Sequence, residues 1–256
     1  MSKKIISYNV NGLRAALNKE FAVWLKNENP DIICIQETKA QSSQIDKPLF
    51  DYLGYHQLWY SAQKKGYSGV GLLSRDVPDY YEYGIGIDKY DIEGRLIRAD
   101  FGEITVISAY FPSGTTGDVR QDFKIDWLTD IQKFIDNLKL KRPNIILSGD
   151  FNICHKEIDI NHPEKHHKMS GFLPEERQWL TEFLKSGFID SFREFNNEPD
   201  QYSWWSYRAN ARQKNLGWRI DYHMVSKSIK NKITGAYILQ NVVHSDHCPV
   251  VVEIDF

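Results

Sequence analysis

Polar side chains that could bind a metal ion or transfer protons recur where short apolar runs begin or end. They are the amide, acid, phenol and imidazole groups of Asn9, Asn11, Glu37, Tyr110, Asp150, Asn152, Asp221, Asp246 and His247. In open α/β folds, the loops at one end of a sheet gather such groups into a crevice. The set is rich in oxygen ligands and contains no sulfur, which is what a hard cation such as Mg²⁺ requires.

Each residue of this set also has an ordinary structural interpretation. An acid after a strand is most often a helix cap, an Asn there forms an Asx turn, and a single Tyr usually belongs to the core. Asp246 and His247 alone could be a structural hydrogen-bonded pair. Capping at separate strand ends would not require this mixture of carboxylate, amide, phenol and imidazole groups. The repetition therefore favours one shared metal site.

A second feature is the segment 202–219, which interleaves basic and aromatic residues and contains no Asp or Glu. Its basic and aromatic residues include Trp204, Trp205, Tyr207, Arg208, Arg212, Lys214, Trp218 and Arg219. Basic groups bind phosphates, and aromatic faces hold an exposed sugar or an unstacked base. A core-packed aromatic loop with solvated charges would have the same composition. The segment KKGY at 64–67 is a second candidate phosphate contact.

The apolar runs next to these residues have the length and composition of buried strands. They are 5–10, 31–36, 69–74, 104–110, 144–148, 220–225 and 249–254. Apolar residues from Phe123 to Leu138 recur on one face at helical spacing, and Pro174 begins a second helix that ends near Gly187. No linker, repeat or charge block divides the chain. We therefore expect residues 1–256 to form a single α/β domain.

The bulk composition limits the classes of protein to which the chain can belong. With 256 residues and 41% hydrophobic content, it can bury a sizeable core. A formal net charge of -2 argues against coating nucleic acid through global charge, so any DNA contact must use a local basic face. The three cysteines are widely spaced, which indicates a protein of a reducing compartment such as the cytoplasm. We see no apolar run suited to a signal peptide or a membrane span, so we expect no membrane attachment.

The chain resembles the exonuclease III type apurinic/apyrimidinic endonucleases of the endonuclease/exonuclease/phosphatase superfamily. The matching phrases are SYNVNGLRA (7–15), IICIQETK (32–39), KKGYSGV (64–70), EGR (93–95), SGDFNICHKEIDI (148–160), SGFLPEER (170–177), YSWWSYRANARQKNLGWRIDY (202–222) and SDHCPV (245–250). They occur in family order across nearly the whole chain. The resemblance implies a four-layered α/β sandwich, in which two packed mixed β-sheets are flanked by helices and the active site lies at one end.

The resemblance also implies a site for Mg²⁺, for which Mn²⁺ can substitute. Glu37 corresponds to the principal metal ligand, Asn9 would lie close to the metal and the phosphate, and Asp246 would lie near the metal site. Asp150 corresponds to the acid that orients or deprotonates the attacking water. The sequence leaves open whether one or two metal ions take part.

Four further residues correspond to groups that act on the phosphate. Asn152 would hold the phosphate, and Tyr110 would contact it or the developing charge. Asp221 would orient His247, whose imidazole would face the scissile phosphate. A metal ion together with a cationic His stabilises the added negative charge more in the transition state than in the ground state.

The resemblance further implies that Trp204 and Trp218 line a pocket for an extrahelical abasic sugar, with Leu216 nearby. The whole set of predicted DNA contacts is Lys65, Tyr67, Arg95, Trp204, Arg208, Arg212, Leu216 and Trp218. The implied partner is double-stranded DNA with abasic sites, nicks or blocked 3' ends, bound by a monomer.

The chain departs from the family pattern in three loops. In the first loop, Ser113 and Thr116 stand where some relatives grip DNA with Asn and Arg. In the second, relatives often have asparagines that contact phosphate where this chain has His162, His166 and Met169. In the third, Arg208 stands where some relatives insert an apolar side chain into the duplex. These changes leave the chemistry unaltered and bear on the balance among activities.

The leading hypothesis is a Mg²⁺-dependent nuclease that cleaves 5' to abasic sites, with 3'–5' exonuclease, 3'-phosphodiesterase and 3'-phosphatase activity. One alternative is a dedicated 3'-end processing nuclease with little abasic-site incision. A lipid or small-molecule phosphatase could share the fold, but it would not need the segment 202–219. A noncatalytic DNA-binding module would not need to retain Glu37, Asp150, Asp221 and His247 together.

Overall fold

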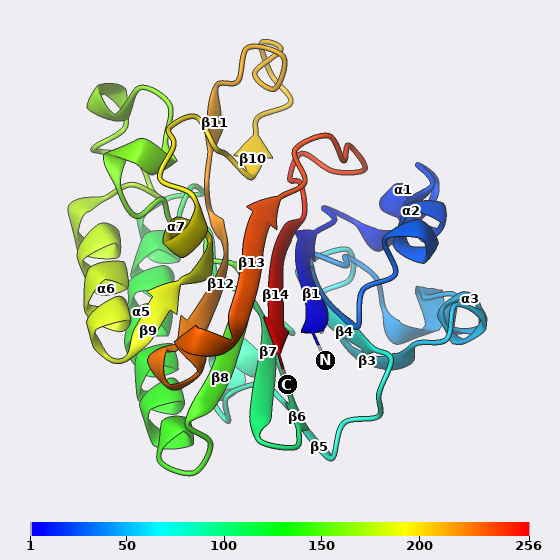
Figure 1. The fold of residues 1–256 in the computed structure, drawn as a ribbon. Helices are drawn as coiled ribbons and strands as arrows, with labels where there is room; N and C mark the ends of the chain where they lie inside the picture. Colours follow the sequence, from blue (N-terminus) through cyan, green and yellow to red (C-terminus); the bar gives the residue numbers. More distant parts are fainter. Residues whose placement is uncertain (1, 256) are drawn as a thin grey trace.

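The computed structural model describes residues 2–255 as two six-stranded mixed sheets packed face to face, with helices on both outer faces (Figure 1). The first sheet has the order β13-β14-β1-β2-β4-β3, with β1 Ser2–Asn9, β2 Ile32–Gln36, β3 His56–Tyr60, β4 Val70–Ser74, β13 Ile233–Ile238 and β14 Val250–Asp255. The second has the order β5-β6-β7-β8-β12-β9, with β5 Tyr80–Tyr83, β6 Leu96–Phe101, β7 Ile104–Tyr110, β8 Asn144–Asp150, β9 Phe188–Asp190 and β12 Asp221–Ser226. β10 Trp204–Trp205 and β11 Gly217–Trp218 form a separate hairpin above the sheets.

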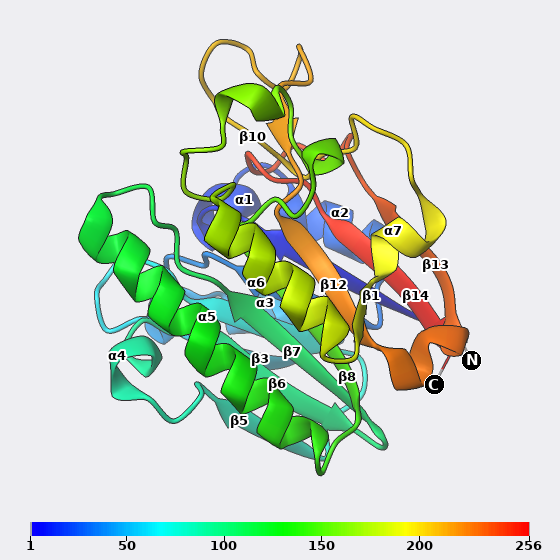
Figure 2. The same cartoon turned by 90° about the vertical axis from the view of Figure 1, so that its left-hand side faces the viewer.

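The helices divide between the two outer faces. On these faces lie α1 Leu13–Leu17, α2 Phe21–Glu28 and α3 Lys47–Tyr52 beside the first sheet, and α4 Asp88–Asp91, α5 Asp118–Lys139 and α6 Pro174–Lys185 beside the second. The short helix α7 Ser191–Phe195 instead packs against strands of both sheets, β13 of the first and β12 of the second. Figure 2 shows α5 and α6 lying across the outer face of the second sheet. This arrangement confirms the predicted α/β sandwich. Among residues 2–255, no helix combines the length and the apolar content needed to cross a membrane.

Strand alternation distributes the apolar side chains among three cores. On β1, Ile5 faces the core between the sheets, whereas Ile6 faces the core beneath α1 to α3. A third core lies between the second sheet and α5 with α6, and it includes the fully buried Trp127. Both faces of the central strands are therefore apolar, which explains their continuous hydrophobic runs. Full burial of one Ile or Leu contributes roughly 1.5–3 kcal/mol.

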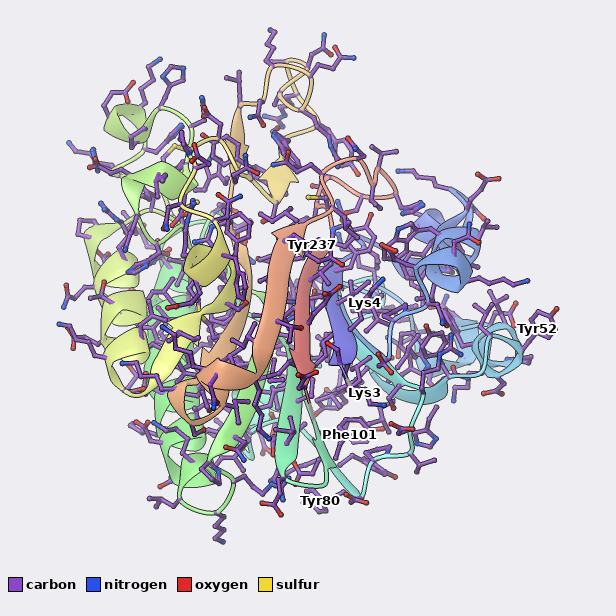
Figure 3. All side chains as sticks on the ribbon, viewed as in Figure 1. Lys3, Lys4, Tyr52, Tyr80, Phe101 and Tyr237 are labelled. Atoms are coloured by element: carbon purple, nitrogen blue, oxygen red, sulfur yellow. The ribbon has the colours of Figure 1, made fainter. Side chains whose placement is uncertain are left out.

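The directions of the strands decide where the polar residues at the strand ends meet. β1 and β2 run parallel, as do β7 and β8, so each pair ends at one edge. β12 and β14 run antiparallel to β8 and β1, so their first residues lie at the same edge. In Figure 1 this edge is at the top, beneath β10 and β11. Figure 3 shows Tyr80 at the opposite end of the molecule, pointing away from it.

Candidate active site

The register of the second sheet brings three candidate residues side by side. Tyr110 pairs with Asp150 between the parallel strands β7 and β8, and Asp221 pairs with Asp150 across β8 and β12. Side chains of paired residues lie on the same face of a sheet. All three therefore face one site at the upper edge.

Asn9 joins this site to the first sheet. Its side chain is buried, and Nδ2 donates hydrogen bonds to Glu37 Oε1 and to Asp150 Oδ2, each at 2.8 Å. Asn9 Oδ1 accepts a hydrogen bond from the backbone N–H of Asn11 at 2.9 Å. Because one amide serves two carboxylates from different sheets, Asn9 fixes the separation of Glu37 and Asp150.

His247 faces Asp150 and is held from behind by Asp221. His247 Nδ1 lies 2.9 Å from Asp221 Oδ2, and Nε2 lies 3.9 Å from Asp150 Oδ2. Burial disfavours the charged ring, but Asp221, Asp150 and Asp246 outweigh burial and raise the pKa of His247 to about 10. The imidazole is therefore a cation at neutral pH.

The surroundings of Asp150 favour its neutral form, whereas those of His247 favour the charged form. Burial raises the pKa of the Asp150 carboxyl to about 7, with Asp221 and Glu37 adding to the rise and His247 opposing it. Its Oδ1 accepts a hydrogen bond from the backbone N–H of Asn152 at 2.8 Å. A carboxyl group with a pKa near neutrality is suited to accept a proton during a reaction at pH 7.

Tyr110 is supported from beneath by Arg95. Burial and the negative charges of Glu37 and Asp150 raise the pKa of the Tyr110 hydroxyl well above its usual value, so the phenol remains protonated and can donate a hydrogen bond. The Arg95 guanidinium lies 5.0 Å from the Tyr110 ring centre and donates to the Tyr110 carbonyl at 2.9 Å.

The part of the chain that the structure describes contains one group of acidic and imidazole side chains able to hold a metal ion. Glu37, Asp150 and His247 each bring a ligand atom within 4.8 Å of the other two. The two carboxylates fit a hard cation such as Mg²⁺, whereas the protonated His247 ring has no free nitrogen with which to bind one. Asp246 is not one of these three residues, but it lines the same cavity, and its carboxylate accepts hydrogen bonds from Asn11 Nδ2 at 2.9 Å and from Trp204 Nε1 at 3.1 Å.

A cavity of about 270 Å³ opens over these residues. It is lined by Glu37, Tyr110, Ser113, Thr115, Asp150, Asn152, Met169, Ser170, Gly171, Trp204, Trp218, Ile220, Asp246 and His247. The rings of Trp204 and Trp218 meet at an interplanar angle of 87°, with their centres 6.0 Å apart. The cavity thus joins a charged floor to two aromatic walls.

Comparison with known proteins identifies this arrangement. Residues 6–247 match the family described as the Endonuclease/Exonuclease/phosphatase family. The chain belongs to this family. It is 46% identical to an exodeoxyribonuclease of Bacillus subtilis over 96% of this chain and 97% of the relative. It is 40% identical to the DNA repair nuclease APEX1 of Danio rerio, over 96% of this chain and 80% of the relative. Its family is one of nucleases and phosphodiesterases.

Solved structures extend the likeness to the fold. A 3'-5' exonuclease from Neisseria meningitidis superposes with a TM-score of 0.92 and 30% identity, over 99% of this chain and 100% of the other. An AP endonuclease from Archaeoglobus fulgidus superposes with a TM-score of 0.91 and 28% identity, with the same coverage. The Endonuclease/Exonuclease/phosphatase fold therefore spans nearly the whole chain.

Within this family fold, the predicted DNA contacts divide between the surface and the interior. Lys65 and Arg208 are exposed and Tyr67 is half-buried, so all three can still meet a ligand. Arg95 is only 2% exposed. Its guanidinium is bound by the Glu93 carboxylate, the Tyr67 hydroxyl and the Tyr110 carbonyl, so a DNA contact of Arg95 stays a prediction that the structure places behind Tyr67 and Tyr110.

Two other predicted contacts also turn inward. The Arg212 guanidinium donates to the carbonyls of Ser245, Gln240 and Val242, so it holds the loop before His247. Leu216 packs against the buried cluster of Tyr202, Trp205, Ala211 and Cys248, and it is not among the described residues that line the cavity. Trp204 and Trp218 do line it, as expected from the sequence.

Three of the residues that depart from the family pattern lie at the cavity or against its Trp218 wall. Ser113 and Met169 line it, and the His166 ring centre lies 5.2 Å from that of Trp218. The neighbouring His162 is exposed. These substitutions therefore lie where they can alter which groups fit against Trp218.

Sequence reasoning missed several residues that support the site. Ser203 Oγ donates to Asp221 Oδ2 at 2.6 Å, and Lys39 Nζ lies 2.8 Å from Glu37 Oε2. Lys124 and Glu176 form a fully buried ion pair behind the cavity. A usable signal was present for Lys124, since it lies on the same helical face as the buried residues Trp127 and Leu128.

Proposed function

We propose that this protein is a Mg²⁺-dependent DNA repair nuclease that hydrolyses the phosphodiester bond 5' to abasic sites and also acts on 3' ends as an exonuclease, phosphodiesterase and phosphatase. The observation that supports this most directly is the composition of one cavity. Its floor carries Glu37, Asp150 and His247, which suit phosphoester hydrolysis, and its walls are two tryptophans. Flat apolar walls beside a hydrolytic floor fit a sugar that has left the helix.

The residues of this chain supply most of the chemistry. Asp150 would take a proton from the attacking water as its oxygen bonds to phosphorus and the bond to the leaving oxygen breaks. The cationic His247 would stabilise the negative charge that develops on the nonbridging oxygens. Tyr110 and Asn152 line the same cavity and would donate hydrogen bonds to the phosphate.

Mg²⁺, or Mn²⁺ in its place, fits the carboxylates of Glu37 and Asp150. When bound, such an ion supplies Lewis-acid stabilisation of phosphate charge and helps to activate water or the leaving oxygen. We propose that Asn9 and Asp246 also lie at this metal site: Asn9 bonds to Glu37 and Asp150, and Asp246 lines the same cavity.

A second candidate function is dedicated 3'-end processing with little abasic-site incision. His166 and Met169 favour it, because they crowd the side of the cavity next to Trp218. A structure of a 3' phosphatase from Neisseria, bound to a product DNA hairpin, superposes with a TM-score of 0.91 and 29% identity, covering 99% of this chain. Both candidates use the same hydrolytic floor and differ in whether an internal sugar can enter.

We further propose that residues 1–256 work as one catalytic domain, as a monomer in the cytoplasm, on double-stranded DNA with abasic sites, nicks or blocked 3' ends. The free, buried thiols of Cys34, Cys154 and Cys248 support a reducing setting. Exposed Lys65 and Arg208 support phosphate contacts outside the cavity.

The test uses one preparation and three duplexes, which carry an abasic site, a 3'-phosphate at a nick and a recessed normal 3' end. Each is incubated with Mg²⁺ and with a chelator, and the products are separated by length and end chemistry. We expect Mg²⁺-dependent cleavage of all three. Release of 3'-phosphate without abasic incision would support the second candidate, and no cleavage of any duplex would refute both.

A further inference from the structure

A buried ion pair lies directly behind the catalytic cavity. Lys124 on α5 and Glu176 on α6 are both fully buried, and Lys124 Nζ lies 2.6 Å from Glu176 Oε1. Burying two charges costs several kcal/mol per ion before their attraction is counted, and well-packed apolar residues often give equal or greater stability. Stabilisation of the fold is therefore a weak explanation for a buried ion pair at this place. The other contacts of Lys124 and Glu176 indicate what else the pair does.

Lys124 reaches the catalytic turn. Its Nζ donates a hydrogen bond to the backbone carbonyl of Asn152 at 2.8 Å. Asn152 is in the left-handed region, with a φ of 52°, and its backbone N–H is held by Asp150. The turn that carries the Asn152 side chain is thus fixed by Asp150 on one side and by a buried ammonium on the other.

Glu176 reaches the opposite wall of the cavity. Glu176 Oε2 accepts hydrogen bonds from the backbone N–H groups of Gly171, at 2.6 Å, and Leu173, at 3.1 Å. Glu176 Oε1 accepts one from Ser170 Oγ at 3.3 Å and one from Gln121 Nε2 at 3.0 Å. We call residues 170–173 the wall strap, because Ser170 and Gly171 line the cavity.

The wall strap in turn sets the position of Trp218. A Cβ added to Gly171 would lie 2.9 Å from the Trp218 ring and 3.1 Å from the Asn152 carbonyl oxygen. Gly171 therefore fills the narrow space between the aromatic wall and the catalytic turn. A small movement of the wall strap must displace either the Trp218 ring or the Asn152 turn, since packed interiors leave little free volume.

We propose that Lys124 and Glu176 are positioning residues that hold the Asp150–Asn152 turn and the Trp218 wall at a fixed separation, so that a sugar against Trp218 has its phosphate at Asn152. This inference rests on the proposed nuclease function. Neither side chain reaches the cavity, so neither is a catalytic residue. Their contribution is the alignment of two substrate-binding elements that come from different parts of the chain.

The test replaces the whole pair by apolar residues. Lys124→Met with Glu176→Leu removes both charges and the hydrogen bonds to Asn152 and the wall strap, and it leaves no charge unpaired. We expect the double variant to fold with a lower unfolding midpoint, because the Asn152 carbonyl and the Gly171 and Leu173 N–H groups lose their hydrogen-bond partners. We expect its kcat on an abasic duplex to fall about 100-fold, as misalignment by about 1 Å can cause.

Two further measurements separate positioning from loss of folded protein. Binding of uncleaved duplex in a chelator, followed by fluorescence anisotropy, should keep its stoichiometry and its Kd within about threefold, because the exposed phosphate contacts are unchanged. The 3'-phosphate reaction should lose less kcat than abasic incision, since it depends on the Asn152 turn but not on a sugar held against Trp218. A matched control is Arg98→Met, which breaks the ion pair with Asp100 on β6, away from the cavity. It should change stability and leave kcat unaltered.

A folded double variant with wild-type kcat on both substrates would overturn the proposal. If the double variant does not fold, Lys124→Met with Glu176→Gln decides by the same criteria, because the Gln carbonyl oxygen can still accept from the Gly171 and Leu173 N–H groups, no charge is left unpaired and the link to the Asn152 turn is lost. A wild-type protein that cleaves no duplex would instead refute the proposed function.

Discussion

His247 Nδ1 lies 2.9 Å from Asp221 Oδ2, and the second oxygen of that carboxylate, Oδ1, is buried without a hydrogen-bond partner among residues 2–255. Ser203 Oγ donates to the same Oδ2 at 2.6 Å. Both donors therefore converge on one oxygen. This arrangement ties the charge of Asp221 to His247 and makes the pair a direct target for a pH experiment.

Asp221→Asn should move the basic limb of the pH profile of kcat/KM to lower pH and reduce the rate at pH 7. Asp221 is the strongest of the groups that raise the pKa of His247 to about 10. Without it, burial again disfavours the imidazolium, so the charged form is lost at a lower pH. Asp76→Asn, at an exposed site at the far end of β4, is the control. An unmoved basic limb would show that titration of His247 does not govern the rate.

Glu37→Gln should leave the fold intact and reduce Mg²⁺-supported cleavage by roughly 100-fold or more, because several kcal/mol of transition-state stabilisation depend on the charge. The amide keeps the shape of the side chain and can still contact Asn9 Nδ2. The measurement is turnover against Mg²⁺ concentration, with circular dichroism as the check on folding. Near wild-type turnover at limiting Mg²⁺ would remove Glu37 from the metal site.

The fold was predictable from sequence where strands are buried on both faces. β1, β2, β7 and β8 are continuous apolar runs whose ends carry polar residues, and the parallel register then brings these ends together. β3, β5, β6, β9 and β13 were not predicted, nor was the β10–β11 hairpin. β6 is an interior strand, but Arg98 and Asp100 interrupt its apolar run. The tyrosines of β5 are largely exposed, and a bulge between Ile233 and Gly235 interrupts the pattern of β13. Such edge strands lack the periodicity on which a sequence prediction depends.

The residues at strand ends were predictable from the sequence, but the directions in which the arginine side chains turn were not. Residues at strand ends, such as Asp150 and Asp221, meet because strand register is local and regular. Arg95 and Arg212 were assigned to the DNA surface from their motifs, but their guanidinium groups bind carbonyls inside the protein. Charge in a sequence does not show which way a side chain turns when buried carbonyl groups compete with solvent for it.

Arg219→Met should lower the free energy of unfolding by about 3–5 kcal/mol, the usual cost of removing one partner from a buried ion pair. Arg219 is 1% exposed and binds Asp159 at 2.8 Å and Asp190 at 2.6 Å, so both acids would remain buried without it. Urea unfolding measures the loss. Lys185→Met, at the exposed pair with Glu182, should change the midpoint very little. Equal midpoints for both variants would contradict this account.

Gly171→Ala should lower stability by about 1–3 kcal/mol through backbone strain at a φ of +96°. It should also reduce abasic incision, because the new Cβ would press on the Trp218 ring. Gly86→Ala is the matched control, since Gly86 has a φ of +79° but its added Cβ would meet no described atom within 4 Å. Gly86→Ala should lose stability through backbone strain alone, Gly171→Ala should lose more because of the added contact, and only Gly171→Ala should lose activity. Equal activity in both would exclude steric control by the strap.

Trp218→Ala should reduce abasic incision more than release of a 3'-phosphate, by roughly tenfold in the ratio of the two kcat/KM values. Loss of the base removes most of the stacking that opposes extrusion of a nucleotide, so a pocket that accepts a bare sugar gains selectivity from the lesion itself. Trp218 forms one wall of that pocket, whereas a 3'-phosphate needs no extruded internal sugar.

Trp59→Ala, at a half-buried tryptophan on β3, controls for the general cost of removing an indole, and it should leave the ratio unchanged. The changed loop residues Thr116, His162, His166 and Met169 should act mainly on affinity and its salt dependence, because none of them belongs to the Glu37, Asp150 and His247 group and exposed loop residues would act through their grip on phosphate. A wild-type protein that removes 3'-phosphates readily but leaves an internal abasic site intact at low salt would show that the altered loops close the pocket to an internal sugar. In that case Trp218→Ala would have no abasic incision to reduce, and the enzyme would be a dedicated 3'-end processor.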